Sequence, residues 1–275
     1  MWIFNSTFGK IFEILFLPFR SMSPWMGMII ISFLTALLML FVYRFTSNQQ
    51  GIRNVKNKIK AHLLEIRLFK DSLRISLMAQ RNILRYNLKY IGYLAKPLLV
   101  MIIPLILILI QLNLWFGYGS LDPGQKVILK AELDADQSLL NTQLVIETSP
   151  GLKIESPPLR IEGENEVNWR LQATEPGIQE LELMVNGQKV IKKVAVAQKK
   201  LSKISPLRIR RNFIDELFNP GEAPIPGNMP VKAIKIEYPD QPMNLFGWRI
   251  HWIIVYFALS IIFGFSFKGI FKVEI

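Results

Sequence analysis

Residues 24–43 read PWMGMIIISFLTALLMLFVY and hold no charged side chain. A bilayer core is ~30 Å thick and a helix rises ~1.5 Å per residue, so about 20 apolar residues are needed to cross it. This stretch therefore predicts a membrane-spanning helix. Two further stretches have the same length and character: 97–116, PLLVMIIPLILILIQLNLWF, and 248–267, WRIHWIIVYFALSIIFGFSF.

The charges of the 275-residue chain, +12 overall, gather between the first two apolar stretches. Residues 44–96 hold twelve Lys and Arg against two acidic residues, whereas 121–247 holds sixteen basic and seventeen acidic residues. Loops rich in Lys and Arg stay in the cytoplasm. We therefore expect a multi-pass protein of the cell (inner) membrane, with the N-terminus outside and the C-terminus cytoplasmic. The first span would act as a signal anchor, because the preceding residues lack a cleavable signal pattern.

The basic segment 49–95 contains no Pro, and its apolar residues are close to heptad spacing, which predicts coiled-coil helices. The chain must return to the membrane, so an antiparallel hairpin is favoured over one long rod. Residues 69–72, FKDS, offer the turn. Basic residues recurring at or near seven-residue steps predict one basic face, made of Arg53, Lys56, Lys60, Arg67, Arg74, Arg81 and Arg85. That face suits anionic lipid headgroups or ribosomal RNA phosphates. Alternatively, its charges only keep this segment on the cytoplasmic side of the membrane and bind no partner.

Before the first span, apolar residues recur at three- and four-residue steps, namely Phe4, Phe8, Ile11, Phe12 and Leu15. This pattern predicts an amphipathic helix. Such a helix would lie in the membrane interface or pack on the other helices.

Between the second and third spans the pattern changes to the alternation of β-strands. About seven short runs between residues 126 and 197, with Asn186-Gly187 as a hairpin turn, predict an immunoglobulin-like sandwich with Trp169 in its core. The Pro-rich residues that follow suggest a short helix at 209–218 and a strand at 231–238.

The predicted fold class is thus an α-helical integral membrane protein with three spans and a cytoplasmic helical hairpin, plus an extracytoplasmic all-β sandwich. The predicted segments are an interfacial helix at 1–22, transmembrane helices at 23–45, 97–117 and 248–267, the basic hairpin at 46–96, the β-sandwich at 118–200, a Pro-rich extension at 201–247 and a cytoplasmic tail at 268–275.

Signals for catalysis are sparse. The chain has no Cys, which excludes disulfides, thiol catalysis and Cys-based metal sites. Its two histidines, His62 and His251, fall on opposite sides of the membrane in the expected topology. Phosphate-binding and dinucleotide-binding loops are missing from the sequence. We expect no enzyme activity, no cofactor, no metal site and no DNA partner.

Polar residues inside the spans are few and uncharged. Ser32, Thr35 and Ser260 lie in the middle or inner half of their spans, whereas Gln111 is nearer the outer face. The first three could line a shallow polar groove, or they could form ordinary hydrogen bonds between helices.

The chain resembles a known family in a span leading into residues 47–73, SNQQGIRNVKNKIKAHLLEIRLFKDSL, and in a second helix ending in residues 93–97, YLAKP. It is similar to the YidC-type insertase superfamily, in the branch of the endoplasmic reticulum membrane complex insertase subunit and the transmembrane and coiled-coil domain proteins. The resemblance covers 23–116 and 248–268 and implies a groove open to cytosol and lipid. It would be lined by Ser32, Thr35 and Ser260, with Arg44 and Lys96 at its mouth. The chain departs from bacterial members in having no ionisable residue deep in a span.

These observations predict a membrane protein insertase or membrane chaperone, with membrane lipids, nascent membrane proteins and the ribosome as candidate partners. The alternative is an envelope scaffold whose external β-domain binds an envelope protein, while its hairpin binds anionic lipid or another coiled coil.

Overall fold

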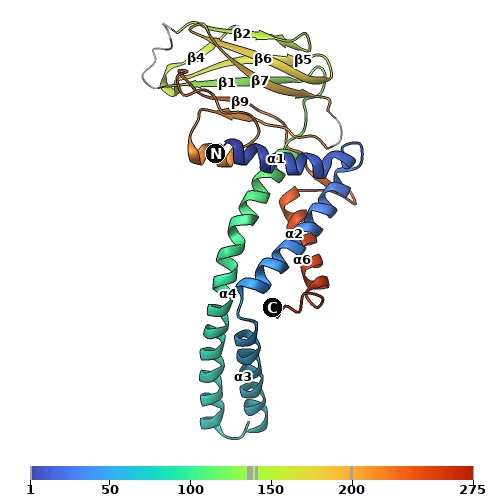
Figure 1. Ribbon diagram of the computed structural model, residues 1–275, viewed down its shortest axis with the longest axis vertical. Coiled ribbons are helices and arrows are strands. Elements are labelled where there is room, and N and C mark those ends of the chain that lie inside the picture. Colours follow the sequence, from blue (N-terminus) through green and yellow to red (C-terminus); the bar gives the residue numbers. More distant parts are fainter. Residues whose placement is uncertain (1, 135–138, 140–141, 199–200, 275) are drawn as a thin grey trace. The chain divides into compact units, whose positions relative to one another are not determined.

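The computed structural model describes residues 2–134, 139, 142–198 and 201–274. The chain forms two compact units. The first, which we call the β-rich unit, comprises 1–27 and 108–253, and the second, the helical unit, comprises 28–107 and 254–275. Three helices pass from one unit to the other: α2 (Pro24–Thr46), α4 (Leu73–Phe116) and α6 (Trp252–Phe267) (Figure 1).

Among the described residues, two helices are long and apolar enough to cross a membrane, α2 and α4. Their composition confirms the first two apolar segments predicted from the sequence. α6 is equally apolar but has 16 residues, a length of only ~24 Å at ~1.5 Å per residue.

The start of the third predicted span is therefore wrong. Residues Trp248–Ile250 form strand β11, which pairs antiparallel with β10 (Met243–Leu245). Because the backbone of these residues is used in the hairpin, the helix cannot begin before Trp252. Trp248 and Arg249, the first two residues of the predicted span, thus lie outside the helix.

The helical hairpin is confirmed. α3 (Gln49–Leu68) begins where the Asn48 side chain accepts a hydrogen bond from the Gly51 amide at 2.8 Å, an ordinary N-cap. The chain turns at 69–72 as predicted, and α4 returns beside α3, with the rings of His62 and Tyr86 stacked at 5.6 Å. The coiled-coil character of this pair stays a prediction.

The boundary expected at residue 97 between hairpin and span does not exist as a break. α4 runs through both Pro97 and Pro104 as one helix of 44 residues. Each proline removes one backbone donor, and an otherwise strongly apolar helix tolerates that loss. The returning arm of the hairpin and the second apolar segment are thus one continuous element.

Two antiparallel sheets form the core of the β-rich unit. The larger has the strand order β3-β5-β1-β9-β8, with β4 also paired to β5, and the smaller has the order β2-β6-β7. The strands are β1 (Lys126–Leu133), β2 (Leu144–Thr148), β3 (Leu152–Ile154), β4 (Leu159–Ile161), β5 (Glu166–Ala173), β6 (Gly177–Val185), β7 (Gln188–Val196), β8 (Leu207–Ile209) and β9 (Val231–Ile236). The 3-10 turn η2 (Glu162–Glu164) joins β4 to β5.

Side chains from both sheets meet in a single apolar core. Leu129 and Trp169 come from the larger sheet and Leu183 from the smaller one, and all three are buried. Trp169 is therefore a core residue, as predicted. The hairpin at Asn186-Gly187 is also confirmed, because these two residues join β6 to β7 with φ of 49° and 80°, the values of a type I′ turn.

The predicted boundary between a sandwich ending at 200 and a separate extension is wrong. Residues 201–247 supply β8 and β9, and β9 lies in the larger sheet between β1 and β8. The expected helix at 209–218 is shorter, because Ile209 belongs to β8, and α5 covers Phe213–Phe218. The alternating apolar residues of β9 fill the same core as those of β1.

The N-terminal helix is α1 (Trp2–Phe16), followed by the 3-10 turn η1 (Leu17–Phe19). Its buried side is formed by Asn5, Gly9, Phe12 and Phe16. The Phe16 ring lies 4.8 Å from that of Trp115. One side of α1 thus packs on its own unit, against the end of α4. Of the five residues predicted to form its apolar face, only Phe12 is buried.

Candidate functional site

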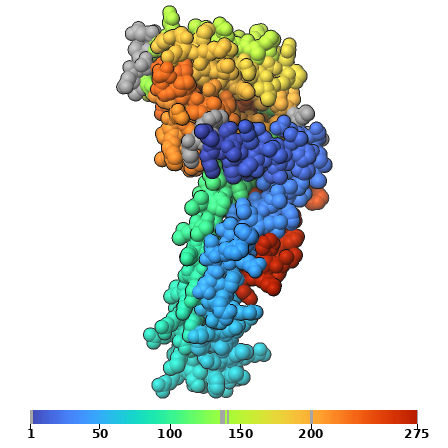
Figure 2. Space-filling model, viewed as in Figure 1, coloured from blue at the N-terminus to red at the C-terminus, as the bar shows by residue number. Residues whose placement is uncertain are grey.

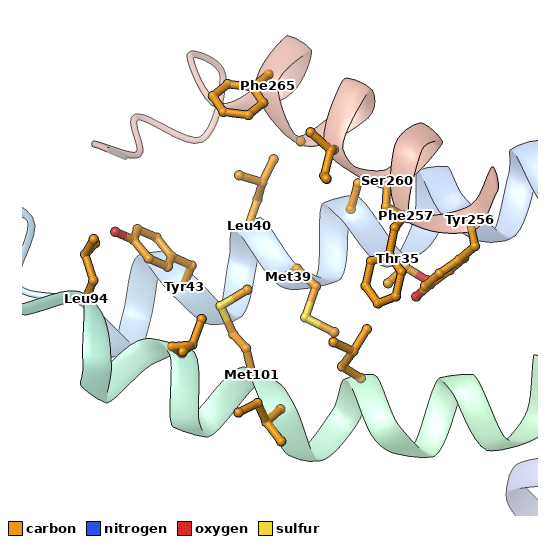
Figure 3. Close-up of a pocket in the computed structure, with 16 residues that line it drawn as sticks. Thr35, Met39, Leu40, Tyr43, Leu94, Met101, Tyr256, Phe257, Ser260 and Phe265 are labelled. Carbon is orange, nitrogen blue, oxygen red and sulfur yellow. The ribbon is translucent and has the colours of Figure 1, made fainter. Parts of the chain in front are cut away.

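The helical unit contains a cavity of about 420 Å³ between three helices. α2, α4 and α6 each contribute side chains to its lining (Figure 3). Its lining is almost entirely apolar and comprises Thr35, Ala36, Met39, Leu40, Tyr43, Leu94, Leu98, Met101, Ile102, Leu105, Tyr256, Phe257, Ser260, Ile261, Gly264 and Phe265.

Three hydroxyl groups gather at one end of this cavity. The side chains of Thr35, Tyr256 and Ser260 point toward one another in Figure 3. The Tyr256 hydroxyl lies within reach of the Thr35 and Ser260 hydroxyls, but none of the three oxygens hydrogen-bonds any other group among the residues that the structure describes. Buried hydroxyls whose hydrogen-bonding capacity is only partly used cost free energy unless a ligand or water completes it. This end of the cavity can therefore accept a hydrogen-bonding group from a guest.

The remaining walls favour an apolar guest. Met39 of α2 and Met101 of α4 lie on facing walls, and methionine adapts its shape to varied neighbours. Gly264 of α6 has no atom within 4 Å of where a Cβ would be, so this part of the wall is open. A space with flexible apolar walls and a small polar end suits an apolar segment carrying occasional polar groups.

The structure unites two of the five residues predicted to form a groove. Thr35 and Ser260 line the cavity, whereas Ser32 is fully buried and lies outside its lining. Arg44 and Lys96 are exposed and do not line it either. Gln111 belongs to the β-rich unit, where it is buried beside Gly9 of α1.

Tyr256 belongs to the polar end of the cavity but was not among the residues predicted from the sequence. It is fully buried and precedes Ser260 by four residues, so both lie on one face of α6. That spacing of two polar residues within an apolar helix is the signal that could have identified it.

The C-terminal tail is held against the end of α2 and the start of α3. The Glu274 amide donates to the Gln49 side-chain oxygen at 2.6 Å, and the Tyr43 hydroxyl donates to the Glu274 carbonyl at 3.2 Å. Arg53 and Lys56 each approach the Glu274 carboxylate at 3.7 Å. Two residues of the predicted basic face thus contact a carboxylate of the chain itself.

The other members of the basic face are exposed, namely Lys60, Arg67, Arg74, Arg81 and Arg85. They form no ion pair within the part of the chain that the structure describes. Their charges are therefore free to meet an external anion. His62 contacts Glu65 at 2.8 Å and Tyr86 by stacking, so it is a structural residue of the hairpin.

A buried ionic cluster in the β-rich unit was not foreseen. The ammonium group of Lys192 on β7 is fully buried, donates to the Ser205 carbonyl at 2.6 Å and pairs with Glu222. Burial lowers the pKa of Lys192, while Glu222 opposes that shift. The guanidinium group of Arg208 donates to the Ala223 and Ile191 carbonyls. These contacts fasten the loop after α5 to both sheets.

Among the described residues, no group of three or more His, Asp or Glu is placed to hold a metal ion. Comparison of the chain with protein-family models, with curated proteins and with solved structures found no match. The three-helix cavity is therefore the feature on which a functional argument can be built.

Proposed function

We propose that this protein is a membrane protein insertase or membrane chaperone, in which the three-helix cavity receives an apolar segment of a client chain. The observation that carries the proposal is a cavity of about 420 Å³ with adaptable apolar walls and hydroxyl groups of Thr35, Tyr256 and Ser260 at one end. A client helix entering a bilayer brings mostly apolar side chains and a few polar groups. The cavity offers contacts of both kinds.

Three further points support the proposal. α2 and α4 are long and apolar enough to cross a membrane. The exposed cations of the hairpin suit the anionic headgroups of the cytoplasmic leaflet, worth ~1 kcal/mol per residue near the surface. The resemblance of residues 23–116 to the YidC-type insertase superfamily favours membrane protein insertion as the function of these helices. In this proposal α6 is a third, short span, the hairpin is cytoplasmic, and the β-rich unit is an immunoglobulin-like domain outside the cytoplasm.

The test uses the natural absence of Cys. Single cysteines replace Thr35, Ser260 and Leu38, the last on α2 but outside the cavity lining. In intact membranes we expect Thr35→Cys and Ser260→Cys to crosslink to a short nascent membrane protein and to react with a water-soluble maleimide from the cytoplasmic side. The matched control, Leu38→Cys, should do neither. Equal crosslinking at all three positions, or none at Thr35 and Ser260, would contradict the proposal.

A filled cavity gives a second test. Ser260→Trp places a large side chain into the open space, so it should abolish nascent-chain crosslinking at Thr35→Cys. The helices should keep their hydrogen exchange protection, because the added ring occupies an existing cavity. Crosslinking that persists would mean that the client uses another route.

One observation favours the alternative of a scaffold. The hairpin carries large apolar side chains that are exposed, namely Leu63, Leu64, Leu68, Phe69, Leu73, Leu77, Met78, Leu84, Leu88 and Ile91. Exposed apolar surface of this extent marks binding to another molecule. If cysteines at Thr35 and Ser260 resist both reagents while one at Leu84 crosslinks to a stable protein partner, the scaffold function replaces the insertase function.

A further inference from the structure

α1 of the β-rich unit has a reversed distribution of polar and apolar residues. Asn5 and Gly9 lie on its buried side, whereas Ile3, Ile11 and Ile14 are 82%, 56% and 72% exposed. A helix on a water-facing surface normally shows the opposite pattern. Figure 2 shows α1 as a dark blue ridge on the surface of its unit. Its outward side chains therefore suit an apolar environment.

α5 repeats this reversal. Phe213, Ile214 and Phe218 are more than half exposed, and Glu216 between them is 5% exposed. The two helices are joined, because the Asn5 side chain donates a hydrogen bond to the Glu216 carbonyl. The exposed apolar residues of α1 and α5 thus belong to one connected part of the unit.

The turn between β10 and β11 adds the third element. Phe246 has φ of 50°, Gly247 has φ of 90°, and the Phe246 side chain is 98% exposed. Asn or Gly adopts the left-handed conformation more readily than phenylalanine. An exposed ring at a position that disfavours it, next to Trp248 with 77% exposure, indicates that the ring is needed for a contact outside the chain.

α1 and the β10–β11 hairpin contact or adjoin the ends of apolar helices, and α5 is joined to them through α1. The Phe16 ring of α1 contacts Trp115 and Phe116 at the end of α4. The Trp25 indole at the start of α2 donates to the Asn244 carbonyl of β10 at 3.1 Å. β11 ends at Ile250, two residues before α6 begins. The exposed apolar residues thus belong to elements that adjoin the ends of the helices proposed to cross the membrane.

We propose that α1, α5 and the β10–β11 turn form an apolar collar that lies in the interface of the lipid bilayer and seats the β-rich unit on the membrane surface. The collar is defined by Ile3, Ile11, Ile14, Phe213, Ile214, Phe218, Phe246 and Trp248. Apolar and aromatic side chains at this depth replace contacts with water by contacts with the upper acyl chains. Exposed Lys10 and Arg249 nearby suit phosphate headgroups. The inference rests on the membrane-crossing part of the proposed function, but not on insertase activity.

The test measures depth by spin labelling of the full-length protein. Single cysteines at Ile11, Ile214 and Phe246 carry nitroxide labels in nanodiscs that hold one copy of the chain and lipid only. We expect oxygen to relax each label more efficiently than a water-soluble nickel chelate does. A label at Ile178, an apolar residue of β6 that is 62% exposed, is the matched control and should favour the nickel chelate. If all four labels favour nickel, the bilayer contact does not exist, and another protein is the better candidate for the collar.

A pair of variants separates membrane contact from folding. In Phe246→Asn the turn gains a residue suited to its left-handed position, while the apolar contact is lost. In Phe246→Leu the contact is kept. We expect a label at Trp248 to lose its preference for oxygen only in the Asn variant. Equal values in both variants would overturn the role assigned to Phe246. Maleimide labelling at Thr35→Cys should be unchanged, so failure of the collar is distinguishable from failure of the cavity.

Discussion

Removing the counter-charge of Lys192 is expected to destabilise the β-rich unit severely. In Glu222→Gln the side chain keeps its size, but the ammonium group, which is fully buried, loses its anion. Removing one partner of a buried ion pair costs about 3–5 kcal/mol. The Gln side chain and the Ser205 carbonyl can still accept hydrogen bonds, so the change isolates the charge.

The cost has an upper limit, because Lys192 can release its proton. A lysine in the unfolded chain has a pKa of ~10.4, and deprotonating it costs ~1.36 kcal/mol for each unit by which the pH lies below that pKa. Neutralising Lys192 therefore costs about 5 kcal/mol at pH 7 and about 2 kcal/mol at pH 9. Burial already lowers the pKa of Lys192, and Glu222 opposes this, so loss of Glu222 lowers the pKa further. The unfolded state then binds more protons than the folded state, and the stability of the variant rises with pH.

Hydrogen exchange measured by mass spectrometry on peptides that cover β7 and β8 reads this effect directly. The opening free energy of Glu222→Gln should fall by several kcal/mol at pH 7 and by less at pH 9. The double variant Lys192→Met with Glu222→Gln should recover much of the loss, because no buried charge remains. A single variant within about 1 kcal/mol of the parent at both pH values would refute the reasoning, since 1 kcal/mol is below any buried-charge cost.

Three further changes test the fold. Trp169→Ala should cost about 3–5 kcal/mol through the cavity that it leaves in the shared core, measured as the midpoint of urea unfolding, whereas the exposed Val145→Ala should shift it little. Gly187→Ala should cost about 1–2 kcal/mol, because φ of 80° strains any residue with a Cβ; the thermal midpoint measures it, and an unchanged value contradicts the type I′ turn. Asn48→Ala should cost about 1 kcal/mol of helix stability, seen as faster amide exchange in the first turn of α3 but not at its far end.

Where alternation or apolar length is strong, the sequence predicted the elements closely. Strands β1 and β5 lie within the stretch of alternating residues expected to form strands, because every second residue in each is apolar. The Asn186-Gly187 hairpin was predictable from two residues alone. Strands of three residues, such as β8 and β10, have no room for a periodic pattern, and pairing with a distant strand decides their conformation.

The candidate site was predictable only in part, for a related reason. Thr35 and Ser260 stand out as polar residues in apolar helices, so their type was enough to single them out. Alternation places Lys192 on the same face of β7 as the buried Val190 and Val194, and Lys193 on the other face. The pattern of β7 does not reveal the counter-charge of Lys192, because Glu222 lies in a loop without periodicity. Partners that are distant in sequence leave no local trace.

The place of β9 has a consequence for synthesis of the chain. Leu129 of β1 pairs with Ile236 of β9, so one edge of β1 stays open until β9 has emerged from the ribosome. An open strand edge is a template for pairing with other chains. The larger sheet can therefore close only late in synthesis, after residues 231–236 have been made and have emerged. A chaperone that shields the edge of β1 would be needed only by the nascent chain, not by the folded protein. Stalling of synthesis before residue 231 should leave a product prone to aggregation.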